Sequence, residues 1–485
     1  MTIELNLQTS IETSTDPLKS YVSIAKKFGT SRAFILESLG GPDEDNRFSM
    51  TGLAGRVTVS VQRGRVSVSG EKELVKYFTK RIEESGLVDS YPAGMYLVSD
   101  DAYWQLPRTL GDSLSFTVHD GELASSFLAF FGYDSARYIE KLPRLIEDPE
   151  DGVPDVIYSL VDVLITHYED STKVAVVNSS AWESLPMSRI TSLLAKNIDI
   201  SDSHAPNIPS PIAIKDDITK DEYLEKGRKC LEHIRVGDIY QVQLGHSVTI
   251  QSSASPLDVY RRLRWRNPSP YMALMHFAGV TVICSSPELF LRTSQNSAVM
   301  RPIAGTAPRG GDEDRVRIDL LEDAKEQSEH LMLVDLCRND LSRIASPGSV
   351  ATTTFMAIEE YSHVFHIVSQ VKCKLKESAD VYDIIRATFP AGTMSGAPKV
   401  RAMEIIESLE TSRRGFYSGA FGLIGLNGKD SVLGLAIRMA VHKREKFTIR
   451  ASAGFVADST PEGEWQETLN KLASTYWAVS GEEIR

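Results

Sequence analysis

Cysteine is scarce in this sequence. Its 485 residues contain four cysteines, and no two of them form a C-x-x-C pair. Structural zinc sites and disulfide frameworks both need cysteines at short, regular spacings. Neither is therefore expected, and we interpret the four as ordinary thiols in a reducing cytosol: Cys230, Cys284, Cys337 and Cys373.

Long apolar runs are also missing. No stretch reaches the roughly 18 uninterrupted apolar residues that indicate a membrane-spanning helix. The N-terminal segment MTIELNLQTSIETSTD is polar and acidic, and it lacks the basic segment and apolar run of a signal peptide. We therefore expect a soluble, cytoplasmic protein without a membrane partner.

Positive charge is not in excess. The net charge is −12, and the charged residues are spread along the chain instead of forming a tail. A protein that grips nucleic-acid phosphates without regard to sequence needs clustered lysine and arginine. Nucleic acid is therefore not an expected partner.

The sequence does contain enough apolar residues for a large core. Hydrophobic residues make up 42% of the chain, which suits one large domain or two to three ordinary ones. Residues 34 to 70 alternate short β-rich runs with Gly, Pro and Asp turns, which predicts paired antiparallel strands. The stretch 198–217 is rich in Ser, Pro and Asp, and we predict a linker within it at 201–216.

The second half opens with a helix signal. Thr219 and Glu222 stand at the spacing of a capping box, before apolar positions at helical spacing. Strands and helices are then predicted in alternation. The strands are expected at 241–250, 271–277, 280–286, 431–441 and 446–457, and the helices at 315–346, 380–389, 397–410 and 464–480.

Two of these predicted helices each carry a pair of glutamates three residues apart. The pairs are Glu326 with Glu329 and Glu464 with Glu467, and this spacing places both carboxylates of a pair on one helix face. Four converging carboxylates would repel each other without a cation between them, and oxygen ligands suit Mg²⁺. One such pair alone is more often a solvated helix face, so the neighbouring motifs decide.

Those motifs occur in a fixed order. They are SPELFL (286–291), RPIAGT (301–306), EHLMLVDLCRND (329–340), GTMSGAPKVRAME (392–404), FYSGAFG (416–422) and ETLNK (467–471). Together they resemble the chorismate-binding domain of anthranilate synthase component I and of its relatives, the aminodeoxychorismate, isochorismate and salicylate synthases. The N-terminal half is similar through LES (36–38), NRFSMTG (46–52) and FGYDSARYIEKLP (131–143).

The resemblance implies an α+β fold. Antiparallel β-sheets pack as a sandwich with helices outside, in two interlocked domains of the anthranilate synthase component I type. We assign 1–200 to an N-terminal domain with a regulatory pocket, 201–216 to the linker and 217–485 to the chorismate-binding catalytic domain.

The resemblance also implies roles for the metal and substrate residues. Glu329 and Glu467 match direct Mg²⁺ ligands, and Glu326 and Glu464 match the carboxylates that complete the shell. The metal would hold the C1 carboxylate of chorismate. Residues that match the rest of the substrate site are the clamp for the second carboxylate, a nearby cation and three backbone donors: Arg438, Tyr417, Lys471, Gly305, Thr306 and Gly454.

Three further residues match the chemistry. The reaction replaces the ring hydroxyl at C4 by a nucleophile at C2, and because hydroxide leaves poorly it needs a proton donor. Glu288 in SPELFL matches that donor, and Thr393 in GTMSG is assigned to the catalytic group with it, as is Lys471. His366 in VFHIVS matches the histidine tied to the later elimination of pyruvate, and a histidine here permits that step without requiring it.

The nucleophile follows from two positions. Relatives that add water carry a lysine base where this chain has Gln241, and aminodeoxychorismate synthases commonly carry a nucleophilic lysine where it has Ala304. The resemblance therefore implies direct attack by ammonia. No glycine-flanked nucleophilic cysteine with a downstream histidine is present, so a separate glutamine amidotransferase subunit is implied, and homo-oligomer formation stays open.

A feedback pocket is implied as well. The LES segment, Ser49 and NPSPYM resemble the tryptophan-binding pocket of the family, which lies between the domains. The residues assigned to this inhibitor site are Leu36, Glu37, Ser38, Ser49, Asn267, Pro268, Ser269, Tyr271 and Met272.

Several functions remain open from the sequence. The first is amination of chorismate followed by elimination of pyruvate to anthranilate. The second is a 2-amino-2-deoxyisochorismate synthase that stops before elimination. An isochorismate synthase and a non-catalytic regulatory subunit rank lower, because the glutamate pairs, Glu288 and Arg438 are all present while the lysine base is not.

Overall fold

The computed structural model describes residues 2–42, 48–116, 123–149, 152–196, 198, 200, 204–277 and 279–484. Asn46 of the NRFSMTG motif and residues 201–203 of the predicted linker lie outside these residues. In the described ranges, 24 strands join into one hydrogen-bonded network, antiparallel except where β1 (Ile3–Thr13) pairs with β7 (Leu114–Phe116). No helix in these ranges is long and apolar enough to cross a membrane.

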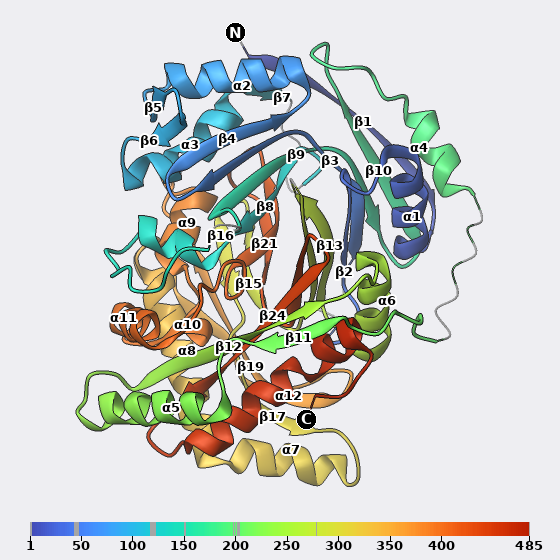
Figure 1. Ribbon diagram of the computed structural model, residues 1–485. Coiled ribbons are helices and arrows are strands. Elements are labelled where there is room, and N and C mark those ends of the chain that lie inside the picture. Colours follow the sequence, from blue (N-terminus) through green and yellow to red (C-terminus); the bar gives the residue numbers. More distant parts are fainter. Residues whose placement is uncertain are drawn as a thin grey trace.

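The N-terminal half forms the upper part of the molecule in Figure 1. Its other strands are β2 (Ala33–Glu37), β3 (Ser49–Gln62), β4 (Arg65–Gly70), β5 (Val88–Tyr91), β6 (Gly94–Leu97), β8 (Ser126–Phe131), β9 (Val156–His167) and β10 (Ser171–Asn178). Its helices are α1 (Pro17–Phe28), α2 (Lys72–Glu84), α3 (Asp100–Asp112), the short η1 (Tyr133–Tyr138) and α4 (Met187–Leu194).

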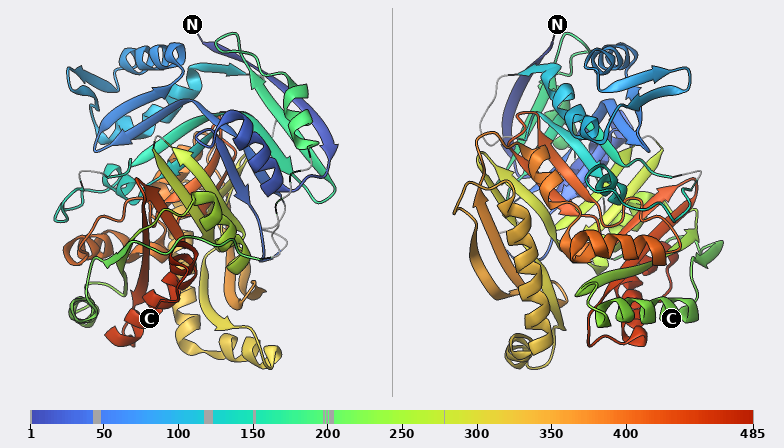
Figure 2. Two further views of the ribbon diagram at one scale, coloured as in Figure 1. Left: turned by 45° about the vertical axis from the view of Figure 1, so that its right-hand side comes forward. Right: turned by 90° about the vertical axis from the view of Figure 1, so that its left-hand side faces the viewer.

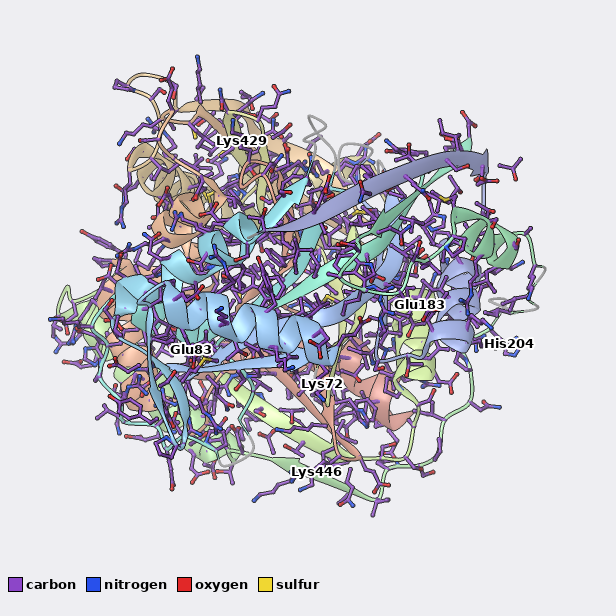
Figure 3. The ribbon with its side chains drawn as sticks, turned by 90° about the horizontal axis from the view of Figure 1, so that it is seen from above. Lys72, Glu83, Glu183, His204, Lys429 and Lys446 are labelled. Carbon is purple, nitrogen blue, oxygen red and sulfur yellow. The ribbon has the colours of Figure 1, made fainter. Side chains whose placement is uncertain are left out.

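The outer helices are amphipathic. One face of α2 buries Leu74, Phe78 and Ile82, while Lys72 and Glu83 are exposed on the side of the molecule that Figure 3 shows. This division is what a helix that covers a sheet requires.

The C-terminal half supplies the remaining elements. Its strands are β11 (Ala213–Asp216), β12 (Gln241–Gln251), β13 (Tyr271–Phe277), β14 (Val280–Ser286), β15 (Leu289–Ser294), β16 (Ser297–Met300), β17 (Ile303–Pro308), β18 (Ala351–Glu360), β19 (Val364–Lys374), β20 (Gly396–Ala397), β21 (Ala420–Gly425), β22 (Ser431–Leu435), β23 (Met439–Lys443) and β24 (Lys446–Phe455). Its helices are α5 (Lys220–Arg235), α6 (Pro256–Arg266), α7 (Glu313–Glu322), α8 (Ala324–Ser342), α9 (Val381–Thr388), α10 (Gly392–Ser395), α11 (Lys399–Leu409) and α12 (Pro461–Ser480).

The two halves share their sheets. The N-terminal β8 pairs with β21 from Phe131 opposite Ala420 to Ser126 opposite Gly425, and β2 pairs with β13. Figures 1 and 2 show β8 and β9 crossing beside β21 in the middle of the molecule. One hydrophobic cluster accordingly runs through both halves, with Phe130 packed on Phe416 and Phe421. The expected α+β fold of interlocked antiparallel sheets with outer helices is confirmed.

Local sequence signals explain where the site-bearing helices begin. The predicted capping box at Thr219 and Glu222 starts α5. Asp323 caps α8 by accepting from the backbone N–H groups of Lys325 and Glu326, and Thr460 caps α12 ahead of Pro461. These caps fix the first turns of the two helices that carry the glutamate pairs.

Three predicted elements are wrong in detail. The linker 201–216 is not irregular throughout, because Ala213–Asp216 forms β11 and pairs with the far end of β12. The helix 315–346 is broken at Asp323, whose extended backbone separates α7 from α8. The strand 431–441 is split into β22 and β23 by a bend at Arg438, which has a φ of 50°.

Candidate active site

The four predicted metal ligands come from two helices. Glu326 and Glu329 lie on the first turns of α8, and Glu464 and Glu467 on the first turns of α12. Burial, followed by repulsion from Glu329 and more weakly from Glu467, raises the pKa of Glu326. Burial also raises the pKa of Glu464, with a further contribution from Glu467. The two pairs therefore act on each other across the gap between the helices.

This donor set fits a magnesium ion that keeps water ligands. All four donors are carboxylates, which suit a hard cation, and a cation would relieve the repulsion among them. They are spread more widely than a closed cage: within the described ranges, no three of them bring oxygens within 4.8 Å of one another. Mg²⁺ commonly takes one or two carboxylates directly and fills its other positions with water and substrate.

Gln241 adjoins this carboxylate group. It is the first residue of β12 and fully buried, and its Nε2 donates to Oε1 of Glu329 at 2.9 Å. Ala304 lies on β17. The two positions at which relatives carry a lysine are therefore an amide and a methyl group in this chain.

Glu288 lies in the short link between β14 and β15 and is 8% exposed. The Thr393 hydroxyl, on α10, donates to Glu288 Oε1 at 3.2 Å. Burial raises the pKa of Glu288 to about 8, although this hydrogen bond and the charges of Arg438 and Lys471 act in the opposite direction. Glu288 is therefore protonated at neutral pH, as a proton donor must be.

Arg438 occupies the bend between β22 and β23. Its pKa is lowered by burial, while Tyr417, Glu467 and Glu288 favour its charge. Within the described part of the chain, its guanidinium has no hydrogen-bond or ion-pair partner. Tyr417 is held next to it by a 2.8 Å hydrogen bond to the Ser452 hydroxyl. Arg438 is only half-buried, and a guanidinium without a partner in the described chain suits capture of a planar carboxylate.

Lys471 lies one turn beyond Glu467 on α12. Its Nζ donates to the Ser452 carbonyl at 3.2 Å and lies 3.4 Å from Glu467 Oε1. It therefore connects the carboxylate group to β24, the strand that carries Gly454.

His366 faces β17 from the neighbouring strand β19. Its Nδ1 is 2.9 Å from the Gly305 carbonyl and 3.1 Å from the Thr306 hydroxyl. Burial lowers the pKa of His366 to about 4, so the ring is neutral. Nδ1 must carry the proton to donate to Gly305, which leaves Nε2 as an acceptor.

Gly305 has a φ of 67°, and a Cβ there would lie 3.3 Å from Glu326 Oε2.

Five of the predicted feedback residues line a cavity of about 120 Å³: Leu36, Glu37, Ser38, Tyr271 and Met272. The cavity is smaller than the roughly 300 Å³ at which ligand pockets begin. Ser49 lies behind it and accepts from the Ser38 N–H at 3.1 Å, while Asn267, Pro268 and Ser269 form the turn before β13. The sequence missed other lining residues, among them Phe48, Arg292 and Phe421. Inhibition by tryptophan stays a prediction.

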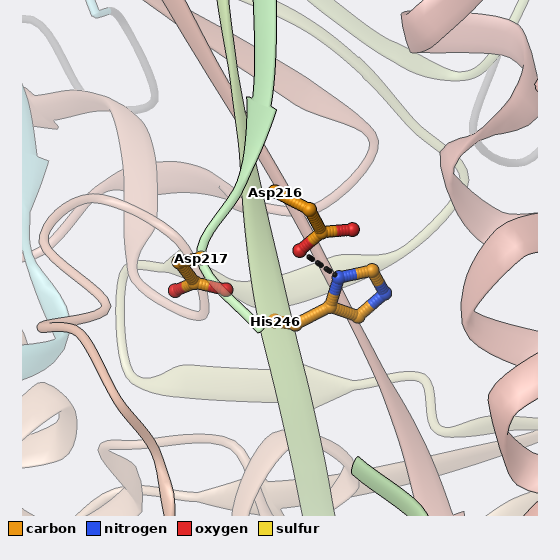
Figure 4. A group of neighbouring side chains, drawn as sticks. All are labelled: Asp216, Asp217 and His246. Carbon is orange, nitrogen blue, oxygen red and sulfur yellow. Dashed lines mark hydrogen bonds and ion pairs between the residues drawn. The ribbon is translucent and has the colours of Figure 1, made fainter. Parts of the chain in front are cut away.

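One carboxylate–histidine group was not foreseen. Asp216, Asp217 and His246 lie together where β11 meets β12 (Figure 4). The His246 nitrogens are both engaged, Nδ1 by Asp216 at 2.9 Å and Nε2 by the Thr468 hydroxyl at 3.0 Å, and its ring stacks on Trp465. No ring nitrogen is left for a metal. Instead the group fixes α12, and with it Glu464 and Glu467, onto β12.

The sequence and the fold are similar to those of known proteins. A family model for chorismate binding enzymes matches residues 89–476. A 2-amino-4-deoxychorismate synthase of Streptomyces globisporus is 42% identical over 97% of this chain and 95% of its own length, and an anthranilate synthase component 1 of Pseudomonas putida is 36% identical over 96% and 92%. The crystal structure of anthranilate synthase component I from Streptococcus pneumoniae aligns with a TM-score of 0.72 at 29% identity, covering 88% of this chain and 92% of that one.

Proposed function

Because the chain belongs to the chorismate-binding enzyme family, we propose that it aminates chorismate: ammonia adds to ring carbon C2 as the hydroxyl on C4 leaves. The observation that carries this proposal is Glu288. It is a buried acid whose pKa is raised to about 8 and which accepts a hydrogen bond from Thr393. The neutral amide of Gln241 stands where relatives that add water carry a lysine base.

The bonds change in one concerted pattern. The nitrogen lone pair forms the bond to C2, the two ring double bonds shift, and the C4–O bond breaks. The Glu288 proton goes to the departing oxygen, which leaves as water instead of hydroxide. Glu288 becomes a carboxylate, and the new ammonium group returns one proton to restore the acid.

Two anion sites hold the substrate. Chorismate carries two carboxylates, and the partner-free guanidinium of Arg438, next to Tyr417, suits the one on the enolpyruvyl group. Glu329 and Glu467 are the proposed direct ligands of Mg²⁺, with Glu326 and Glu464 completing its shell. When bound, the metal supplies the positive charge for the ring carboxylate. Gly305, Thr306 and Gly454 are proposed as backbone donors to substrate oxygens.

Two products are possible, and each has support. The name of the Streptomyces globisporus relative describes a molecule with nitrogen at C2 and no oxygen at C4, which is the product of amination alone. It is the same compound as 2-amino-2-deoxyisochorismate.

Anthranilate requires a further step. A base removes the proton from C2, the C3–O bond breaks and the ring becomes aromatic as pyruvate leaves. The neutral His366, with Nε2 available as an acceptor, supports this second product, as do the anthranilate synthase relatives.

The decisive assay mixes pure protein with chorismate, MgCl₂ and ammonium chloride. Mass spectrometry identifies the aminated product, and a lactate dehydrogenase assay counts pyruvate. One pyruvate for each fluorescent anthranilate indicates the full reaction, while an aminated product without pyruvate indicates the shorter one. Absence of any nitrogen-containing product would overturn the proposal.

We infer that ammonia comes from a separate glutaminase subunit. All four cysteines of this chain are buried, and burial raises the pKa of the Cys230 thiol to about 12, so none is a suitable nucleophile for glutamine. The isolated chain should therefore use ammonium salts but not glutamine.

A further inference from the structure

The Gln241 amide has a fixed orientation. Its Nε2 donates to Glu329 Oε1 at 2.9 Å, and because a carboxylate only accepts, the amide cannot be turned over without losing this bond. The side chain is 0% exposed, and its Oε1 has no hydrogen-bond partner in the described part of the structure. A buried acceptor without a donor is unfavourable.

Other buried polar atoms also lack partners, so position is what distinguishes this one. Gln241 lies beside the carboxylates of α8 and opposite β24, where Gly454 faces the start of β12. A Cβ on Gly454 would lie 3.0 Å from Gln241 Nε2 and 2.8 Å from Gln243 Nε2. Gly454 does not have a left-handed φ, so the space next to the amides is what requires glycine here.

We propose that Oε1 of Gln241 is the acceptor that receives ammonia and turns its lone pair toward C2, an inference that rests on the proposed amination. Ammonia has three N–H donors and one lone pair. An acceptor holds one N–H and leaves the lone pair free, whereas a donor would occupy the lone pair itself. As the bond to C2 forms, the nitrogen becomes positive and its N–H bond to Oε1 strengthens.

Three substitutions separate this role from a structural one. Gln241→Met keeps the length of the side chain and removes both donor and acceptor. Gln241→Lys keeps an N–H donor for Glu329, removes the acceptor and adds a positive charge. Gln251→Met makes the same change at the far end of the same strand and is the matched control.

The measurement is the steady-state rate of the purified full chain as ammonium chloride is varied with chorismate and MgCl₂ saturating. Losing one hydrogen bond to the nucleophile should lower kcat/KM for ammonium about tenfold in both Gln241 variants. The KM for chorismate should change less than about twofold, since no ground-state contact to chorismate is removed. In Gln241→Lys the new positive charge beside Glu329 should raise the magnesium concentration that is required, so MgCl₂ is kept saturating for this variant.

The outcomes are distinguishable. Wild-type kcat/KM for ammonium in Gln241→Lys or Gln241→Met would overturn the role of Oε1 while leaving the amination intact. A wild-type protein that does not aminate chorismate at all would overturn the proposed function first. Thermal unfolding of each variant checks the fold, and the lysine variant decides if the methionine variant does not fold.

Discussion

At the scale of single residues, the site depends on groups kept in unfavourable states. Glu288 is a buried acid that keeps its proton at neutral pH, and the half-buried Arg438 has no anionic partner among the described residues. Substrate supplies what each group lacks: a carboxylate for Arg438 and a departing oxygen for the Glu288 proton. The states of these two groups in the empty enzyme therefore favour substrate binding and proton donation.

Glu288→Gln tests this link. The variant should lose about 100-fold or more in kcat, because an amide cannot give its proton to the leaving oxygen. The wild-type kcat/KM for free ammonia should fall as pH rises through about 8, where Glu288 loses its proton.

The same raised pKa makes the stability of the folded chain depend on pH. The folded-state pKa of Glu288 is raised, so between its ordinary value and about 8 the folded chain holds a proton that the unfolded chain has released. Stability therefore falls across that window as pH rises. Glu288→Gln should raise Tm relative to wild type more at pH 8 than at pH 5, while the exposed Glu377→Gln should not. An equal difference at both pH values would contradict the buried, protonated state.

At the scale of elements, α8 and α12 present their first turns to each other, and their glutamates repel. MgCl₂ should raise the Tm of the wild type, since it removes this repulsion and binds the folded state alone. Glu329→Gln or Glu467→Gln should abolish both the Tm increase and turnover. Glu326→Gln and Glu464→Gln should reduce them less.

Scanning fluorimetry with and without MgCl₂ provides this measurement. Asp335→Asn, an exposed site on the same helix α8, is the control and should keep the wild-type response. An undiminished magnesium response in both Glu329→Gln and Glu467→Gln would exclude these residues as ligands.

The elements were predictable where a local signal existed. The capping box of α5 and the glutamate spacing on α8 and α12 are properties of a few neighbouring residues. The breaks were missed: Asp323 caps α8 through its side chain, and Arg438 takes a φ of 50° with its carbonyl bonded to the distant Ser285 N–H. The same holds for pairs such as Thr393 with Glu288 and Gln241 with Glu329, which are 105 and 88 residues apart. Only the family resemblance suggested that these residues share a site.

At the scale of the whole molecule, the halves should not be separable. The pairings of β8 with β21 and β2 with β13 would leave long apolar strand edges exposed if the chain were divided. Fragments 1–212 and 213–485 should therefore aggregate when made alone. Calorimetry of the full chain should show one cooperative transition, although chains of this length often show more. Two transitions, with one fragment folded in isolation, would contradict the interlocked fold.

The central claim is that this site selects ammonia over water. Water attacks C2 only if a base removes its proton, whereas ammonia needs only delivery and orientation. Gln241 is a neutral amide and Ala304 carries no base. Chromatography of wild-type protein incubated with chorismate and Mg²⁺, with and without ammonium chloride, tests this directly. The account predicts an aminated product only with ammonium, and little or no isochorismate or salicylate without it. Rapid isochorismate formation in the nitrogen-free reaction would contradict it.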